Sequence, residues 1–395
     1  MRHALVVVDR RFVLADGIWY TQSALGPDSG DMWLPFFDRI TVAGRADDPG
    51  GLDLAQMSRT DPRLEIHCLP NLAGLRAQVT QRHLVRRRLA ELMDGVDAVI
   101  LRLPGENSFV AANLAAERGL PVAGDMGGCA YDGMVGRGGL RSRLYASLRY
   151  RRTRRAVQRC QFMHYVTQNY LQARYPAAPG AAVLAVSNVS IPPPDPAALR
   201  ARLVRIGQRR ERLVFGTVGS LVGKLKGVHI AIEALGRLRS TLPAFEYRVL
   251  GGGDPAPLQA LAERCGVADS VVFDGLRPGG QPVLDWLDGI DVYLQPSLRE
   301  GVARATIEAM SRACPAIVSD IAGMYELIDD PERVPPADVP ALMRAIGRAV
   351  DPAWQRAQAE RNWSRAQDYS STVLEPMRHE FWTGFAQAAL KRKTR

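Results

Sequence analysis

Short apolar runs alternate with longer amphipathic stretches along most of this chain. The runs are apolar on both faces, which is typical of parallel strands that helices cover from both sides. Repeated strand–helix–strand units predict a doubly wound α/β fold. The expected strands are 4–9, 39–43, 64–69, 98–103, 122–125, 162–167 and 183–187, followed by 213–218, 247–250, 271–273, 292–294 and 316–319.

A proline-rich segment from Ile191 to Pro196 interrupts this alternation once. Proline removes a backbone donor and fixes φ, so neither a helix nor a central strand continues through it. We expect a Rossmann-like domain over 1–190, a linker over 191–211 and a second Rossmann-like domain over 212–353. Crossover helices and a basic tail over 354–395 are expected to return to the first domain. Ligands of such sheets bind beyond the carboxyl ends of the strands. We therefore expect two domains that face each other across a cleft, with hinge closure.

Composition excludes several classes of protein. With 47% hydrophobic and 23% charged residues, the chain is expected to be globular. Its five cysteines include no Cys-x-x-Cys pair, which argues against a disulfide framework or a zinc–cysteine site. The apolar run after Met1 ends at Asp9, as in a buried strand rather than a signal peptide. No stretch approaches the ~18 apolar residues of a spanning helix. We expect a cytoplasmic protein in a reducing compartment.

Two glutamates stand out near the end of an expected strand. Glu300 lies in the turn after residues 292–294, and Glu308 lies about one and a half turns into the next helix. Backbone amides at the start of that helix suit a phosphate, and a carboxylate can accept two adjacent sugar hydroxyls. Taken alone, this spacing is equally compatible with a capping glutamate and a solvated helix glutamate.

Four neighbouring motifs favour a role of these two glutamates in ligand binding over a purely structural role. They are Gly-Ser-Leu-Val-Gly-Lys-Leu-Lys-Gly at 219–227, Leu-Gly-Gly-Gly at 250–253, Phe-Asp-Gly at 273–275, and Asp-Val-Tyr-Leu-Gln-Pro-Ser at 291–297. In this order, the second half resembles the nucleotide-sugar domain of GT-B retaining glycosyltransferases of family 4. Residues 300–310 look closest to the branch that builds capsular and exopolysaccharides. The resemblance implies a GT-B fold and a retaining glycosyltransferase that moves a sugar from a UDP- or GDP-sugar to a glycan acceptor, which we expect to be lipid-linked.

The resemblance also assigns roles to individual residues. Lys226 takes the family's lysine position on the donor diphosphate, Glu308 the position on the ribose hydroxyls, and Glu300 the position near the sugar and its reacting face. The other expected donor-binding residues are Gly17, Gly219, Ser220, Arg277, Gly301, Val302 and Arg304. Many relatives carry arginine where this chain has Ser220, and we hypothesise that Arg304 replaces that charge. No metal or other cofactor is expected, and the chain contains no Asp-x-Asp motif.

The first half matches the family more loosely. Asp16 and Gly17 come after the first strand, where relatives have a glycine loop that faces the donor. Asp125 ends another expected strand, near the place where many relatives carry a histidine that is absent here. We expect Asp125 either to act as an acid, base or positioning residue, or to serve as a buried capping group. His164 is expected to be a core histidine.

An expected helix from Arg137 to Arg159 holds nine arginines and no acidic residue. It could rest on an anionic membrane, which suits a lipid-linked acceptor, or be a solvated helix in an arginine-rich chain. If the helix rests on a membrane, the cytoplasmic protein is also in peripheral contact with the inner face of the cell membrane. A nucleic-acid partner is not expected, because few aromatic residues lie among the arginines.

Two rival functions remain open on the sequence alone. One is a nucleotide-sugar 2-epimerase of the GT-B fold, which needs carboxylates placed for elimination in the first domain. The other is a non-catalytic protein that binds sugar nucleotides.

Overall fold

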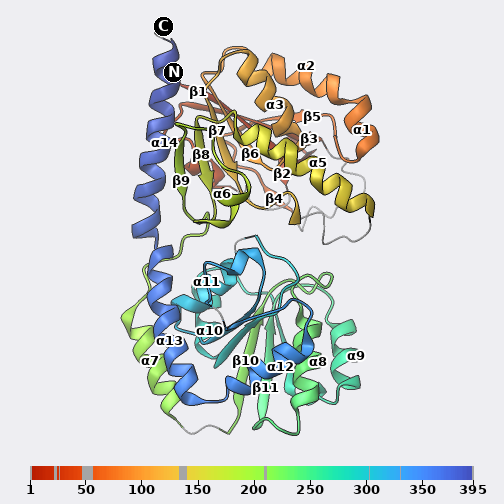
Figure 1. The fold of residues 1–395 in the computed structure, drawn as a ribbon, viewed down its shortest axis with the longest axis vertical. Coiled ribbons are helices and arrows are strands. Elements are labelled where there is room, and N and C mark those ends of the chain that lie inside the picture. Colours follow the sequence, from red (N-terminus) through yellow and green to blue (C-terminus); the bar gives the residue numbers. More distant parts are fainter. Residues whose placement is uncertain are drawn as a thin grey trace. The chain divides into compact units, whose positions relative to one another are not determined.

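The computed structural model describes residues 2–21, 25, 27–46, 57–132, 140–208, 211–301, 303–329 and 331–393. The chain forms two compact units (Figure 1). Unit 1 comprises Met1–Val186 and Pro376–Arg395, and unit 2 comprises Ser187–Glu375. The expected α/β fold with two parallel sheets is confirmed. The segment 191–211, expected as a linker, belongs to unit 2 and contains helix α7 (Pro196–Gly207).

The sheet of unit 1 has a parallel body with the strand order β5-β3-β1-β6-β7-β8-β9. Two further strands are antiparallel: β2 pairs with the end of β1, and β4 pairs with β2. The strands are β1 (His3–Ala15), β2 (Ile18–Thr21), β3 (Arg39–Ala46), β4 (Ser58–Arg59), β5 (Glu65–Leu69), β6 (Ala98–Leu103), β7 (Val122–Met126), β8 (Phe162–Tyr165) and β9 (Ala182–Ala185). Residues 4–8 and 98–101 are completely or almost completely buried, as the two-sided apolar pattern requires.

Strand β1 runs six residues further than expected and turns back into β2. Its residues Phe12–Ala15 pair antiparallel with Ile18–Thr21. Asp16 and Gly17 form the turn between them, with φ angles of 48° and 75°. Positive φ at both central residues is what a two-residue hairpin demands, and Asp-Gly is a favoured pair for it. A hairpin turn thus stands where the resemblance implies a glycine loop, and the donor-binding role of Gly17 stays a prediction.

The helices of unit 1 include one that the C-terminal tail provides. They are α1 (Leu75–Thr80), α2 (Arg82–Leu92), α3 (Glu106–Glu117), α5 (Leu140–Val157), α6 (Tyr170–Arg174), the short η1 (Ser29–Met32), and the part of α14 (Ser371–Lys393) from Pro376 onward. Phe385 of α14 packs edge-on against Phe162 and Phe37, with ring centroids 5.3 and 5.9 Å apart. This aromatic packing confirms that the tail returns to the first unit.

Unit 2 is built on one parallel sheet with the order β12-β11-β10-β13-β14-β15. Its strands are β10 (Leu213–Val218), β11 (Phe245–Leu250), β12 (Val271–Gly275), β13 (Val292–Gln295), β14 (Ala316–Ser319) and β15 (Arg333–Val334). Its helices are α7, α8 (Val228–Leu238), α9 (Ala256–Arg264), α10 (Gln281–Asp288), α11 (Arg304–Ser311), α12 (Val339–Arg348), α13 (Pro352–Ala366) and the short η4 (Ala268–Ser270), η5 (Ala322–Met324) and η6 (Gln367–Tyr369). Helices α8, α9 and α12 cover one face, and α10, α11 and α13 cover the other (Figure 1).

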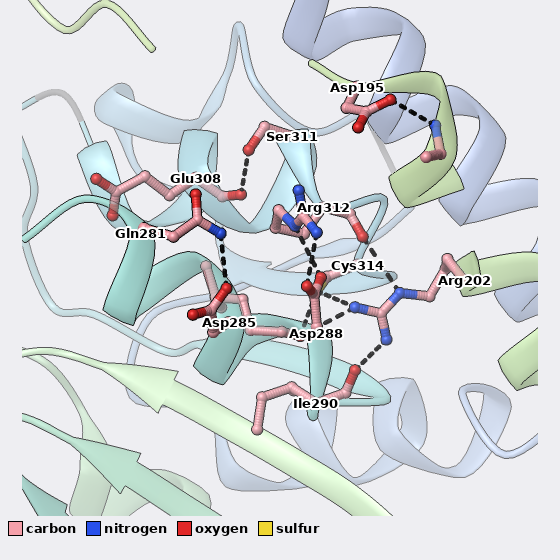
Figure 2. A network of polar contacts seen from close by, with 12 residues as sticks. Asp195, Arg202, Gln281, Asp285, Asp288, Ile290, Glu308, Ser311, Arg312 and Cys314 are labelled. Carbon is pink, nitrogen blue, oxygen red and sulfur yellow. Dashed lines mark hydrogen bonds and ion pairs between the residues drawn. The ribbon is translucent and has the colours of Figure 1, made fainter. Parts of the chain in front are cut away.

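A buried arginine ties α7 to the C-terminal ends of α10 and α11 (Figure 2). Arg202 is buried and donates to three backbone carbonyls, those of Ile290, Leu287 at 2.9 Å and Arg312 at 3.3 Å. Its Nη2 also lies 2.9 Å from Cys314 Sγ. Carbonyls near helix C-termini carry partial negative charge, so they stabilise a guanidinium that has no carboxylate partner among the described residues.

Replacing this arginine should destabilise unit 2. We expect Arg202→Met to lower the free energy of unfolding by about 3 kcal/mol, because buried carbonyls lose their donors. In a unit of this size that corresponds to a fall of roughly 5–10 °C in the unfolding midpoint. Differential scanning calorimetry measures it. The matched control is Arg200→Met, an exposed arginine on the same helix; equal midpoints for the two variants would contradict the assignment.

Candidate active site

The carboxyl ends of β10 and β13 mark the place where the strand order of unit 2 reverses. The chain builds β10, β11 and β12 in one direction, then returns to place β13 on the other side of β10. Loops leave the sheet in opposite directions there, and open α/β sheets bind their ligands at such points. Lys226 comes after β10 and Glu300 comes after β13, so the two principal candidates from the sequence lie at this position.

Direct backbone contacts hold the two loops together. Leu298 N donates to Leu225 O at 2.8 Å. Gly227 has a φ of 70°, and a Cβ at that position would lie 1.8 Å from the carbonyl oxygen of Pro296. Only glycine permits both this conformation and this approach. The residue next to Lys226 therefore fixes the lysine loop against the loop that carries Glu300.

Lys226 and Glu300 form an ion pair at the centre of the site. Lys226 Nζ lies 2.8 Å from Glu300 Oε1, and the two side chains are 32% and 9% exposed. Gly219 lies beneath the lysine, since a Cβ there would come within 2.8 Å of Lys226 Cγ. An ammonium has three donors and this pair uses one, so the lysine keeps donors for an anion that arrives from solvent.

A row of polar side chains from β13 orients Glu300. Its Oε1 accepts from Ser297 Oγ at 2.7 Å and from Gln295 Nε2 at 3.3 Å. Tyr293 OH donates to Gln295 Oε1 in turn. Burial, and then the charge on Glu300, raise the pKa of Tyr293 well above its usual value. In the described part of the chain, Glu300 Oε2 has no hydrogen-bond partner, so it is available to a ligand.

Gln295 and Ser297 carry no role in the sequence prediction. The signal that points to them is the alternation of Tyr293, Gln295 and Ser297, because residues two apart on a strand share one face. Three polar side chains on one face of a strand that is otherwise buried need partners, and Glu300 supplies one.

Glu308 lies on α11 and is separate from this chain of hydrogen bonds (Figure 2). Its carboxylate is directed away from the ion pair between Asp288 and Arg312, and its side chain is 15% exposed. Burial raises the pKa of Glu308, and Arg304 opposes the shift only in part. Arg304 Nη1 lies 4.0 Å from Glu308 Oε1. A half-desolvated carboxylate of this kind gains from hydroxyl donors.

The remaining donor-binding candidates of unit 2 lie in loops that follow its strands or at the start of α11. Ser220 is exposed, and its Oγ accepts from Val222 N at 3.1 Å. Gly301 and Arg277 are also exposed, the latter after β12. Arg304 begins α11 and forms the long ion pair to Glu308. Val302 lies outside the described residues. Their roles toward the donor stay predictions.

Asp125 of unit 1 is a buried ion-pair partner. It pairs with Arg102, and its Oδ1 lies 3.2 Å from His164 Nδ1. Burial by itself raises the pKa of Asp125, but Arg102 and His164 outweigh it and hold the pKa below its usual range. His164 is buried, with Nε2 2.9 Å from Val186 O. A carboxylate that stays ionised in this way suits positioning of Arg102, and its catalytic role stays a prediction.

Neither a metal cluster nor a membrane-spanning helix occurs in the described residues. No three His, Cys, Asp or Glu side chains come together there in a way that could hold a metal ion. Likewise, no helix among them is both long and apolar enough to cross a bilayer.

Comparison with known proteins finds similarity to glycosyltransferases. Residues 212–351 match the family model for glycosyl transferases group 1. Protein CapJ of Staphylococcus aureus is 22% identical over 318 residues, which cover 80% of this chain and 79% of CapJ. The putative colanic acid biosynthesis glycosyltransferase WcaL of Escherichia coli is 34% identical over 131 residues, covering 31% of this chain and 32% of WcaL.

Solved structures resemble the whole chain. Sucrose-phosphate synthase from Thermosynechococcus elongatus superposes with a TM-score of 0.65 at 15% identity, covering 98% of this chain and 99% of the other. Anabaena HepE in complex with UDP and glucose superposes with a TM-score of 0.60 at 15% identity, covering all of both chains. Together with the two-sheet architecture, these matches show that the chain has the GT-B fold, that unit 2 contains a glycosyl transferases group 1 domain over residues 212–351, and that the chain is a transferase enzyme.

Proposed function

We propose that this enzyme moves a sugar from a nucleotide-sugar donor to a hydroxyl of a lipid-linked glycan, with retention of the anomeric configuration, during assembly of a cell-surface polysaccharide. The observation that carries the proposal is the 2.8 Å pair of Lys226 and Glu300 at the reversal point of the sheet. The relative WcaL, named for colanic acid biosynthesis, supports a role in polysaccharide assembly, and HepE with UDP and glucose supports the donor class.

In this mechanism Lys226 stabilises the negative charge of the leaving diphosphate. When the bond between the sugar and the diphosphate breaks, negative charge grows on the phosphate oxygens. A compact ammonium held by Glu300 is already in place, so little reorganisation is needed as that charge develops. The amides at the start of α11 add positive partial charge, and Arg304 adds a full charge beside them.

The two glutamates would fix the rest of the donor. Glu308 offers a carboxylate to the two ribose hydroxyls, and Oε2 of Glu300 offers acceptor capacity to the sugar. The acceptor hydroxyl attacks the anomeric carbon on the face that the diphosphate leaves. One carbon–oxygen bond forms as the other breaks, and the hydroxyl proton passes to the departing phosphate oxygen. Glu300 positions the sugar and forms no covalent intermediate in this scheme.

A ligand screen tests the proposal against its rivals. Thermal shift with UDP, GDP and ADP, and then with their sugars, should raise the unfolding midpoint for one base. With donor and a glycan acceptor, the product should be a glycoside of unchanged anomeric configuration. Conversion of UDP-N-acetylglucosamine into a new sugar without acceptor would instead establish the epimerase. Nucleotide binding without hydrolysis or transfer would establish a non-catalytic binding protein.

Loss of the ammonium should slow transfer strongly. We expect Lys226→Ala to lower kcat/KM by roughly 100-fold, the usual cost of removing one preorganised donor at a developing oxyanion. Steady-state release of the nucleoside diphosphate measures it. Lys224→Ala is the matched control, because Lys224 lies two residues away in the same loop and is exposed. Activity within twofold of wild type for both variants would contradict the assignment of Lys226.

Glu308 should make donor binding depend on pH. Burial raises the pKa of Glu308, so the free protein holds its proton above the usual glutamate range. Ribose hydroxyls donate best to the ionised carboxylate, so donor affinity should rise as pH increases through that raised pKa. Calorimetric titration of the sugar nucleotide between about pH 5 and 7 measures this, since its diphosphate stays ionised there. In Glu308→Gln the rise should disappear; an unchanged pH profile would refute the role.

Helix α5 presents a surface that suits an anionic membrane. Its exposed residues recur at helical spacing, and Leu144 and Leu148 among them are 66% and 41% exposed. The exposed face consists of Arg143, Leu144, Ser147, Leu148, Arg151, Arg154 and Arg155. Two leucines flanked by arginines on one face favour binding to anionic lipid over simple solvation. Residues 137–139 of the predicted basic stretch lie outside the described residues.

Flotation with vesicles of phosphatidylglycerol and phosphatidylcholine tests this surface. We expect the wild-type protein to float with the vesicles at low salt and to be released at high salt. Leu144→Ser with Leu148→Ser should lower the bound fraction about tenfold, because each leucine loses its apolar burial in the lipid interface. Leu84→Ser, an exposed leucine on α2, is the control. Vesicle binding that is absent in the wild type, or equal in all three proteins, would end the membrane proposal.

A further inference from the structure

Unit 1 contains a pocket of about 370 Å³ whose lining includes none of the expected donor-binding residues. Its walls come from the parallel part of β1, from β6 and from the turn after β7, with Asp9, Arg10, Arg102, Gly127 and Gly128 among the lining residues. Strands β1 and β6 are neighbours on either side of the point where the strand order of this sheet reverses. The pocket thus occupies the ligand-binding position of the unit 1 sheet.

Both carboxylates at this pocket already have partners. Asp9 accepts from the backbone amides of Glu106 and Asn107, the latter at 3.1 Å, and so caps α3. Asp125, beneath the pocket, is buried against Arg102 and His164. These acids therefore stabilise the fold and hold Arg102 in place, and their charges are directed at groups other than Arg10.

Arg10 lacks a counterion among the described residues. In that part of the chain its guanidinium has neither a hydrogen bond nor an ion pair. Partial desolvation, and then the neighbouring charges of Arg102 and Arg45, lower the pKa of Arg10. Arg45 donates from Nε, at 2.9 Å, to the backbone oxygen of Asp9, the residue before Arg10. Arg10 is exposed, so water screens part of this repulsion, and a bound anion would relieve the rest.

Arg102 adds further donors beside Arg10. Its Nη1 is engaged by Asp125, and its side chain is 24% exposed. Among the described residues, its guanidinium makes one other contact, a long one from Nη1 to the sulfur of Met32. Its Nε and Nη2 therefore keep free donor capacity, while Asp125 fixes the orientation of the group. A fixed planar guanidinium is well suited to recognise a carboxylate or a phosphate.

The two glycines leave the pocket open. Neither Gly127 nor Gly128 has a positive φ, and a Cβ at either position would meet no atom within 4 Å. Neither the backbone conformation nor the packing therefore requires glycine at these two positions. Glycine also serves where a ligand approaches the backbone closely, and that reason fits the floor of a cationic pocket.

We propose that this pocket binds the acidic group of the acceptor, a phosphate or carboxylate on the sugar that receives the transferred residue, through Arg10 and Arg102. The inference rests on the proposed transfer reaction and narrows its acceptor to an acidic glycan. Arg10 supplies the uncompensated charge, and Arg102 supplies donors whose direction Asp125 sets. A neutral sugar would leave Arg10 without a counterion, so the pocket should discriminate by charge.

Calorimetric titration of the whole protein tests the proposal with glucose 6-phosphate, glucuronic acid and glucose. We expect one or both acids to bind and glucose not to bind, and the two acids tell phosphate from carboxylate. Arg10→Gln should weaken binding of the acid about tenfold or more. Arg76→Gln is the charge-matched control, an exposed arginine on α1, and should bind like wild type. Equal binding of glucose, or affinity unchanged in Arg10→Gln, would overturn the proposal.

Two further measurements separate this pocket from the donor site and from a folding defect. Binding of the acid should persist in Lys226→Ala, and its loss there would place the anion in unit 2 and overturn the proposal. Gly128→Leu adds bulk to the pocket without changing charge, and its Cβ would meet no atom within 4 Å, so it should abolish binding with an unchanged unfolding midpoint. Nucleotide binding is measured in parallel on the wild type. If no nucleotide binds while the acid does, the proposed transferase function fails and the anion pocket stands.

Discussion

The contact between Lys226 and Glu300 depends on which strand lies beside β10. The two residues are 74 positions apart in the chain, and they meet because β13 pairs directly with β10, with Phe215 opposite Val292. Each charge offsets part of the other's desolvation, so removing either one leaves the other partly buried and unpaired. The hydrogen bonds from Ser297 and Gln295 then select one oxygen of Glu300 for this structural contact. Its second oxygen, Oε2, therefore stays available to accept from the donor sugar, as the proposed mechanism requires.

Strands with two buried faces were the elements most accessible to prediction. Their apolar runs leave little doubt about type or extent, and β6, β10 and β14 begin and end where the sequence predicts. Two departures have local causes. The Asp16–Gly17 turn sends the chain from β1 directly into a hairpin, because both residues adopt positive φ. The proline run does interrupt the alternation of strands and helices, but its last proline begins α7. The Asp195 side chain caps this helix by accepting from Ala197 N.

The resemblance of four motifs to the family 4 pattern put forward Lys226, Glu300 and Glu308 as candidates. It could not identify their partners, which depend on how strands align sideways. Asp125 shows this in unit 1, because it stands opposite Arg102 on β6 and opposite His164 on β8. The three side chains therefore meet because they stand opposite one another on three neighbouring strands. No local pattern in the sequence specifies that register, because each strand alone is compatible with several alignments.

The two units treat positive charge differently, and the difference matches what each site is proposed to hold. In unit 2 the cation is already paired, so an incoming diphosphate shares Lys226 with Glu300 and the lysine hardly needs to move. Preorganisation of this kind favours a transition state over tight ground-state binding. In unit 1, Arg102 is paired with Asp125, but Arg10 is exposed and has no such partner among the described residues, so its charge is available to a ligand. Such a site is built for selecting among substrates by charge, which is the task of an acceptor pocket rather than of a leaving-group site.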